Sequence, residues 1–172
     1  MAEVQPYYAF VQAHAQDTQA ELLAAVDVPC LYFPGLPDLA LTDQFKTIRF
    51  TPNRGVPADV GQQGIVPLRK SHGNAFNMMI TMGRAKNNDL VIPDQRVSKF
   101  HVYFRNVGDE WRITDANSTN GTSVDGVNLE TTQQSVTLRS NSRIVLSEAI
   151  EVLFLEPADV YAMLQDAKAW VL

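Results

Sequence analysis

The stretch GRAKNNDLVIPDQRVSKFHVYFRNVGDEWRITDANSTNGTSVDG, residues 83–126, decides the fold expected of this chain. Apolar and polar residues alternate over 100–106 and again over 111–115, as they do in strands with one buried face. Glycine follows asparagine at 120–121 and aspartate at 125–126, and both pairs are typical of tight turns. The stretch therefore predicts short antiparallel strands joined by tight turns.

The same pattern of short candidate strands separated by turn residues extends on both sides of this stretch, from residue 64 to residue 156. Many short strands with turn residues between them are typical of an antiparallel β-sandwich. Strands are expected at 65–69, 78–83, 89–92, 100–106, 111–115, 122–124, 135–139, 143–146 and 151–156.

Residues 1–63 are predicted to form an irregular, partly helical extension that packs on this core. Alanine and leucine favour a helix up to about residue 26, with Asp17 or Thr18 as a cap. Repeated proline and glycine then break the chain, and the apolar runs at 30–33 and 47–50 are candidate strands.

Residues 157–172 are predicted to form a C-terminal helix that docks onto the sandwich. Pro157 suits the first turn of a helix, and the apolar residues that follow it share one helical face. That face consists of Val160, Leu164, Ala167 and Val171. The expected fold is mainly β, with a sandwich over 64–156 between the N-terminal extension and this helix.

The composition predicts a folded chain without a membrane segment. It has 172 residues, of which 45% are hydrophobic and 19% charged, enough for a substantial core. No apolar run approaches the ~18 to 20 residues that cross a bilayer, and the N-terminal residues lack the pattern of a signal peptide. Because Cys30 is the sole cysteine, an internal disulfide and a cysteine metal cluster are excluded. We expect a cytoplasmic protein with no cofactor and no metal.

The charge is unevenly distributed along the chain. Residues 84–105 hold five basic and two acidic side chains, a balance of +3, while the whole chain carries −5, which leaves −8 for the rest. The acidic total counts against nucleic acid as a partner. The basic segment suits a small anion, although an ordinary solvated set of charges explains it equally well.

Three groups of polar residues sit where predicted strands meet turns. They are Gly-Arg at 83–84, Ser-x-x-His at 98–101 and Ser-Thr-Asn-Gly-Thr at 118–122. A permanently charged arginine fork, hydroxyls, a carboxamide and loop amides all suit the oxygens of a bound phosphate. The set favours phosphate binding over a reaction.

In order and spacing, these motifs resemble those of the forkhead-associated (FHA) domain. The matching positions are Gly83-Arg84, Ser98 with His101, Asn120-Gly121-Thr122 and the turn glycine Gly126. The resemblance covers residues 64–156. It implies a β-sandwich that recognises phosphothreonine through loops at one end.

The resemblance also implies roles for single residues. Arg84, Ser98 and Lys99 are expected to hold the phosphate, with Thr119 nearby. Lys99 is the loosest of these, because that position tolerates several polar residue types in the family. Asn120 resembles the asparagine that hydrogen-bonds the ligand's backbone beside the phosphothreonine.

Two further sets of roles follow from the resemblance. Arg96 resembles a position that often selects the third residue after the phosphothreonine, and an arginine there favours Asp or Glu in the ligand. Loop-structuring roles are expected for Gly83, His101, Gly121 and Thr122, with the histidine bracing the binding loops through internal hydrogen bonds. The implied partner is a phosphothreonine protein or peptide, modified by a Ser/Thr kinase, and the implied function is that of a signalling adaptor.

Two other functions compete with this interpretation. Ser98, His101 and Asp115 contain the atoms of a hydrolytic triad, but residues three apart on an extended segment point to opposite faces. No Gly-x-Ser-x-Gly elbow or phosphate loop is present, so catalysis is not expected. The other rival is a phosphate-independent interaction scaffold that uses the terminal extensions as its binding surface.

Overall fold

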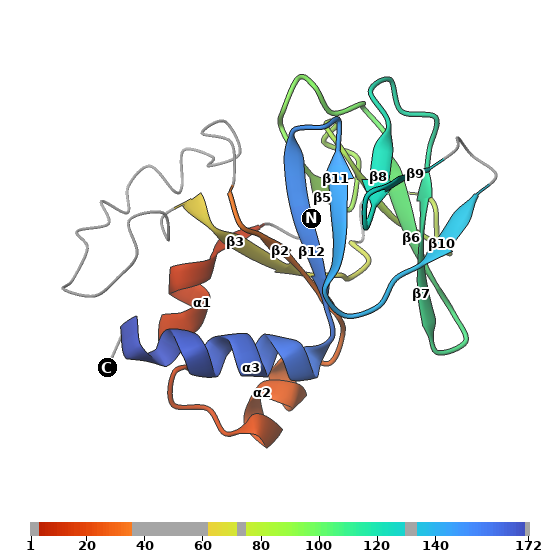
Figure 1. The fold of residues 1–172 in the computed structure, drawn as a ribbon. Helices are drawn as coiled ribbons and strands as arrows, with labels where there is room; N and C mark the ends of the chain where they lie inside the picture. Colours follow the sequence, from red (N-terminus) through yellow and green to blue (C-terminus); the bar gives the residue numbers. More distant parts are fainter. Residues whose placement is uncertain (1–3, 36–61, 72–74, 130–133, 171–172) are drawn as a thin grey trace.

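The alternating run at 100–115 forms the hairpin on which the smaller of two sheets is built. Strand β6 (Val102–Val107) pairs with β7 (Glu110–Asp115) from Val102 opposite Asp115 to Val107 opposite Glu110. The structure, a computed structural model, describes residues 4–35, 62–71, 75–129 and 134–170 (Figure 1). Within that part, the hairpin lies at the centre of a five-stranded sheet.

The smaller sheet has the order β10-β7-β6-β4-β5. Its pairs are antiparallel except for β4 with β5, which run parallel. The outer strands are β4 (Ile80–Gly83), β5 (Leu90–Val91) and β10 (Ser135–Thr137).

The larger sheet has seven strands in the order β1-β3-β2-β12-β11-β8-β9, and all of its pairs are antiparallel. The bounds of its strands are Gln5–Pro6 (β1), Cys30–Phe33 (β2), Gly64–Pro67 (β3), Thr122–Val124 (β8), Val127–Asn128 (β9), Ser142–Leu146 (β11) and Ile150–Leu155 (β12).

The two sheets enclose the main hydrophobic core. Met82 and Phe104 from the smaller sheet and Ile144 and Phe154 from the larger one are all fully buried in it. Each such side chain contributes about 1.5 to 3 kcal/mol by leaving water, so this core supplies much of the stability.

Strand β2 connects this core to a second one. Leu31 and Phe33 lie in the core between the sheets, whereas Cys30 and Tyr32 belong to a cluster on the other face of the same sheet. The period of two along a strand places successive residues on opposite faces, and here both faces are covered. Strand β2 is therefore a central strand, buried on both sides.

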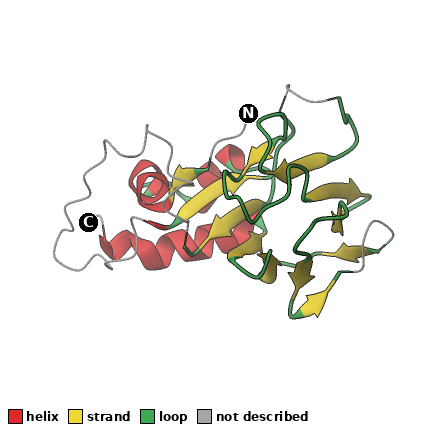
Figure 2. Ribbon diagram, turned by 90° about the horizontal axis from the view of Figure 1, so that it is seen from above, coloured by secondary structure: helices red, strands yellow, loops and turns green. Residues whose placement is uncertain are grey.

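Three α-helices cover that other face, gathered on one side of the strands (Figures 1 and 2). They are α1 (Tyr7–His14), α2 (Gln19–Ala25) and α3 (Pro157–Ala167), the last followed by a 3₁₀ turn (Lys168–Trp170). The buried side chains of the helices include Phe10, Leu22 and Leu164. Among the residues described, no helix is long and apolar enough to span a membrane.

The predicted fold is confirmed: it is mainly β, a sandwich with helices before and after it. Each of the nine strands expected between 65 and 156 overlaps an observed strand, and 122–124 has the expected bounds. The C-terminal helix buries Val160, Leu164 and Ala167 as expected, while Val171 lies outside the described residues.

The helical segment expected up to about residue 26 is confirmed, and Thr18, one of its two predicted caps, is the N-cap of α2. The chain forms two helices there, because Thr18 caps the start of α2 in a reciprocal capping box with Glu21. The candidate strand at 30–33 is confirmed as β2, and the one at 47–50 lies outside the described residues. The boundary between 63 and 64 stays a proposal; strand β2, which precedes it, pairs with β3 and β12.

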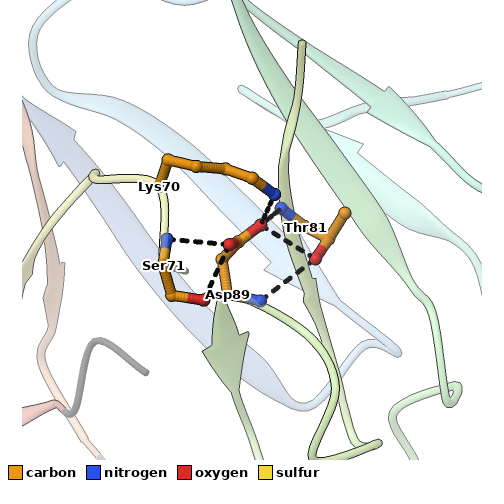
Figure 3. Close-up of polar contacts among 4 residues, drawn as sticks. All are labelled: Lys70, Ser71, Thr81 and Asp89. Carbon is orange, nitrogen blue, oxygen red and sulfur yellow. Dashed lines mark hydrogen bonds and ion pairs between the residues drawn. The ribbon is translucent and has the colours of Figure 1, made fainter. Parts of the chain in front are cut away.

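A buried carboxylate fastens the segment after β3 to β4 and β5 (Figure 3). Asp89 is 0% exposed, and its Oδ1 accepts from the amide and hydroxyl of Ser71, both at 2.8 Å. Its Oδ2 accepts from Lys70 Nζ at 2.8 Å and from the amide of Thr81 at 2.8 Å. Burial acts to raise the pKa of this carboxyl, but the bonds from Lys70, Thr81 and Ser71 outweigh it and lower the pKa to about 2.

We expect Asp89→Asn to lower the free energy of unfolding by about 3 kcal/mol at neutral pH, because it removes the charge that these donors surround. Since the folded pKa lies below the unfolded value of about 3.9, the carboxylate stabilises the fold above that pH. The difference between the two proteins in urea titrations should therefore shrink as the pH falls from about 4 to 2. Asp27→Asn, which removes an exposed ion pair with Arg69, is the control and should cost under about 1 kcal/mol. Equal losses in both variants would contradict a structural role for Asp89.

Candidate functional site

The predicted site residues come together at one end of the sandwich. They lie on the segments that follow β4, precede β6 and join β7 to β8, at the upper end in Figure 1. The turn between β11 and β12 is at the same end. Loops carried by a rigid sandwich are a common place for binding residues.

Gly83 allows two of these segments to touch. The amide of Arg84 donates to the Ser98 carbonyl at 2.9 Å, and the amide of Ala85 donates to the Lys99 carbonyl at 3.1 Å. A Cβ on Gly83 would lie 2.5 Å from the Lys99 carbonyl oxygen, closer than real Cβ atoms approach. The absence of a side chain at this position therefore lets the Ser98–Lys99 backbone pack against β4.

The guanidinium of Arg84 is held by one of its nitrogens. Its Nε donates to the Val97 carbonyl at 3.1 Å, and the side chain is half-buried. Among the described residues nothing bonds Nη1 or Nη2, so both terminal nitrogens can donate to a ligand. An anchored, planar fork loses little freedom on binding an oxyanion.

The hydroxyls of Ser98 and Thr119 join the two loops beside this arginine. The amide of Thr119 donates to Ser98 Oγ at 2.9 Å, and the Ser98 hydroxyl donates to Thr119 Oγ1 at 3.3 Å. Thr119 is exposed and Ser98 half-buried, so a ligand can reach both oxygens. Lys99 follows with an exposed side chain.

Asn120 is fixed by its amide nitrogen. Its Nδ2 donates to the Arg96 carbonyl at 2.8 Å, and the hydroxyl of Ser147 donates to the same carbonyl at 2.7 Å. The side chain of Asn120 is exposed and its carbonyl oxygen remains available as an acceptor. Asn120 can therefore accept a hydrogen bond from the backbone of a bound peptide.

His101 lies beneath these loops, fully buried, and bonds both of them. Its Nδ1 accepts from the Ser98 amide at 3.0 Å, so Nε2 carries the proton and donates to the Gly121 carbonyl at 3.1 Å. Burial lowers the pKa of His101, although the bond to Gly121 acts in the opposite direction. A neutral imidazole is the form that satisfies both loops at once.

Asp115 orders the loop between β7 and β8, which carries Thr119 and Asn120. It accepts from the Ser118 amide at 2.7 Å, from the Ser118 hydroxyl at 2.6 Å and from Thr122 Oγ1 at 2.6 Å. Gly121 follows with a φ of +76°, where glycine is favoured. None of the bonds of Asp115 reaches His101, and His101 receives the amide of Ser98 rather than its hydroxyl, so the residues are not arranged as a hydrolytic triad.

Asp94 is a site residue that the sequence analysis missed. Its carboxylate accepts from Arg96 Nε at 2.9 Å and from Arg96 Nη2 at 2.6 Å. The hydrogen bonds from Arg96 lower the pKa of Asp94, and those to Asp94 raise the pKa of Arg96. The expected selectivity residue is thus already paired within the chain. A carboxylate two residues before the arginine was the available signal.

Asn88 is a second residue that was missed. It is 6% exposed, and its Nδ2 donates to the Ala85 carbonyl at 2.8 Å and to the Lys99 carbonyl at 2.6 Å. It holds the segment after β4 against the segment before β6. The sequence marks it only as part of a turn.

The ion pairs show which positive charges of the basic segment at residues 84–105 are neutralised. Asp94 pairs with Arg96, and Asp89 pairs with Lys70, which lies outside the basic segment. Across the described ranges, neither Arg84 nor Lys99 makes an ion pair with an acidic side chain. The loops that carry the hydroxyls therefore present uncompensated positive charge.

Residues 80–147 match the family model of the FHA domain. This chain contains an FHA domain. The match begins at β4 and ends just after β11, so β1, β2, β3 and β12 of the larger sheet lie outside it. No curated protein matches the sequence.

Solved structures of FHA domains are similar to part of the chain. One, from an analysis of phosphothreonine-dependent FHA domain interactions, is 27% identical, covers 48% of this chain and 80% of its own, with a TM-score of 0.41. Mycobacterium tuberculosis EmbR in complex with a low-affinity phosphopeptide is 28% identical over 45% of this chain and 20% of its own (TM-score 0.39). An FHA domain of an Arabidopsis thaliana hypothetical protein is 22% identical over 74% and 86% (TM-score 0.48). The family assignment comes from the sequence match and the motifs, not from these partial superpositions.

We expect Gly83→Ala to displace the Ser98–Lys99 backbone of the FHA domain and to lower the free energy of unfolding by about 1 to 3 kcal/mol, as overpacking does. Thermal melting measures the loss, and NMR shifts of the 98–99 amides report the displacement. Gly35→Ala is the matched control, because a Cβ there meets nothing within 4 Å. Unchanged shifts at 98–99 would show that the close approach at Gly83 does not position this loop.

Proposed function

We propose that this chain binds phosphothreonine in a partner protein and acts as a cytoplasmic adaptor in Ser/Thr-kinase signalling. FHA domains are phosphothreonine-binding modules, and one observation carries the proposal for this chain. The Arg84 guanidinium, anchored through Nε with both terminal nitrogens available, sits on the loop that bonds Ser98, whose hydroxyl is joined to Thr119.

The chemistry of the ligand suits these donors. Phosphothreonine carries about −1.5 to −2 charges near neutral pH and has three strong acceptor oxygens. Arg84 supplies a charged, planar fork, Ser98 and Thr119 supply hydroxyls, and Lys99 supplies a second cation. In this proposal Asn120 bonds the peptide backbone, while Gly83, His101, Gly121 and Thr122 keep the loops in place.

The expected affinity is moderate. Charge-assisted hydrogen bonds contribute roughly 1.5 to 3 kcal/mol each. Four or five of them face an association cost of about 4 to 15 kcal/mol. The balance is compatible with micromolar binding, about −8 kcal/mol.

The terminal segments take a structural part in this proposal. We divide the chain into an extension (1–63), a sandwich (64–156) and a docking helix (157–172). Helices α1, α2 and α3 bury their apolar faces against one another and against β2, β3 and β12. Because these faces are already covered, we assign α1, α2 and α3 to supporting the sandwich, and a phosphate-independent scaffold is the alternative to this proposal.

We expect Arg84→Ala to weaken binding of a phosphothreonine peptide by more than about tenfold, because it removes two charge-assisted bonds. The affinity of Arg84→Lys should lie between those of the unmutated protein and Arg84→Ala, because lysine keeps the charge and loses the planar pair of donors. Isothermal titration with peptides selected from an oriented phosphothreonine library is the measurement.

Arg105→Ala is the control for these variants. This arginine belongs to the same basic segment, but it lies over the Tyr103 ring at 5.7 Å, on the strand rather than on the loops. Unphosphorylated and phosphoserine peptides complete the series. Equal weakening by Arg84→Ala and Arg105→Ala would show that only the total charge of the protein matters. Unchanged binding by Arg84→Ala would refute the phosphate site.

We also propose that Arg96 favours an acidic residue three positions after the phosphothreonine. Asp94 already occupies its Nε and Nη2, so the preference of the unmutated protein should be small. Asp94→Asn removes the competing charge and keeps an oxygen for the Arg96 amide, which now donates to Asp94 Oδ1 at 2.8 Å.

The expected result is that Asp94→Asn increases the preference for an acidic over a neutral residue by about threefold, the size of a partly exposed ion pair. Arg96→Ala should abolish it. Fluorescence anisotropy with paired peptides measures both effects. If Arg96→Ala keeps the same preference for an acidic residue, a residue other than Arg96 causes the selectivity.

A further inference from the structure

A small polar pocket adjoins the candidate peptide site on the side of β8 and β9. Its volume is about 180 Å³, and its lining includes Asn120, Gly121, Asn128 and Glu148. Asn120 belongs to both the pocket and the proposed phosphopeptide site, so a peptide bonded to Asn120 would lie next to the pocket.

The loop that carries Glu148 is fixed on the binding loops. Ser147 and Glu148 form the turn between β11 and β12 with φ values of +55° and +54°, a conformation that few non-glycine residues adopt. The Ser147 amide donates to the Gly121 carbonyl at 3.0 Å, and its hydroxyl donates to the Arg96 carbonyl at 2.7 Å. The turn is therefore tied to the loop that carries Asn120 and to the segment that carries Arg96, and Glu148 keeps a defined place beside them.

Glu148 contributes a negative charge that no cation among the described residues pairs with. Its side chain is exposed, and it makes no ion pair with any of the described residues. Arg96 pairs with Asp94, and Arg143, on strand β11 that leads into the turn, pairs with Glu151 at 2.7 Å. The pocket thus combines one available carboxylate with amide oxygens, which is a set of acceptors for a cation.

Two apolar residues of the lining suit the stem of a long basic side chain. They are Leu129, which is 7% exposed, and Val145, which is half-buried. Lysine and arginine place their methylene stems along such surface while the charged end reaches an acceptor. An aspartate or glutamate of the ligand would meet Glu148 with the same sign of charge.

We propose that this pocket receives a lysine or arginine side chain from the peptide and that Glu148 is its ion-pair partner. The inference rests on the proposed phosphothreonine binding and adds a second specificity element to it. Arg96 and Glu148 then select opposite charges at different positions of one ligand.

The test uses phosphothreonine peptides in which one flanking position at a time is Lys, Ala or Glu. At one position the unmutated protein should bind Lys about threefold more tightly than Ala, as expected for a partly exposed ion pair. Glu148→Gln should remove that preference and leave the affinity for the Ala peptide unchanged. Glu148→Lys should reverse it in favour of Glu.

Asp109→Asn is the matched control, because it removes one exposed negative charge from the β6–β7 turn at the opposite end of the sandwich. It should leave the preference intact. If Glu148→Gln melts at a lower temperature, Glu148→Asn provides a neutral residue that tolerates positive φ.

The outcomes separate the two proposals. Failure of every phosphothreonine peptide to bind would overturn the proposed function and this inference with it. Phosphothreonine binding with equal affinity for Lys and Ala at every position would overturn the inference alone. A Lys preference that persists in Glu148→Gln would also overturn it.

Discussion

The buried imidazole of His101 is the contact on which the candidate site depends. One nitrogen accepts from the loop that carries Ser98 and the other donates to the loop that carries Asn120, through the Gly121 carbonyl. A protonated ring would have two donors and no acceptor, and the Ser98 amide would lose its partner. Burial favours the neutral form, so the same environment that hides the ring also keeps it in the state that joins the loops.

Around this contact the loops are held mainly by backbone groups and short polar side chains. Gly83 admits the Ser98–Lys99 backbone, Asn88 bonds the Lys99 carbonyl, and Asp115 orders the turn before Thr122. The side chains of Arg84 and Asn120, which are assigned to the ligand, are each held through one nitrogen and keep free donors or an acceptor. This division leaves the site organised before a ligand arrives, which reduces the entropy that binding costs.

Much of the fold and most of the candidate residues could be predicted from the sequence. Period-two patterns and turn pairs are local signals, so strand positions such as 122–124 followed from them. Contacts between loops carry no such local signal, because they depend on which loops meet in the fold. Examples are the bond from Asn88 to the Lys99 carbonyl and the bond from the Ser147 hydroxyl to the Arg96 carbonyl. The strands β1 and β9 were missed because each has two residues, which is too short to show an alternating pattern.

The position of strand β2 has a consequence for how the chain folds. Cys30 pairs with Leu155, 125 positions further along, whereas β6 and β7 meet through a tight turn. Closing so long a loop costs entropy before any contact compensates for it, so local hairpins have the kinetic advantage. The larger sheet is continuous only once distant parts of the chain have met, and during synthesis one edge of β2 has no strand partner until β12 has left the ribosome.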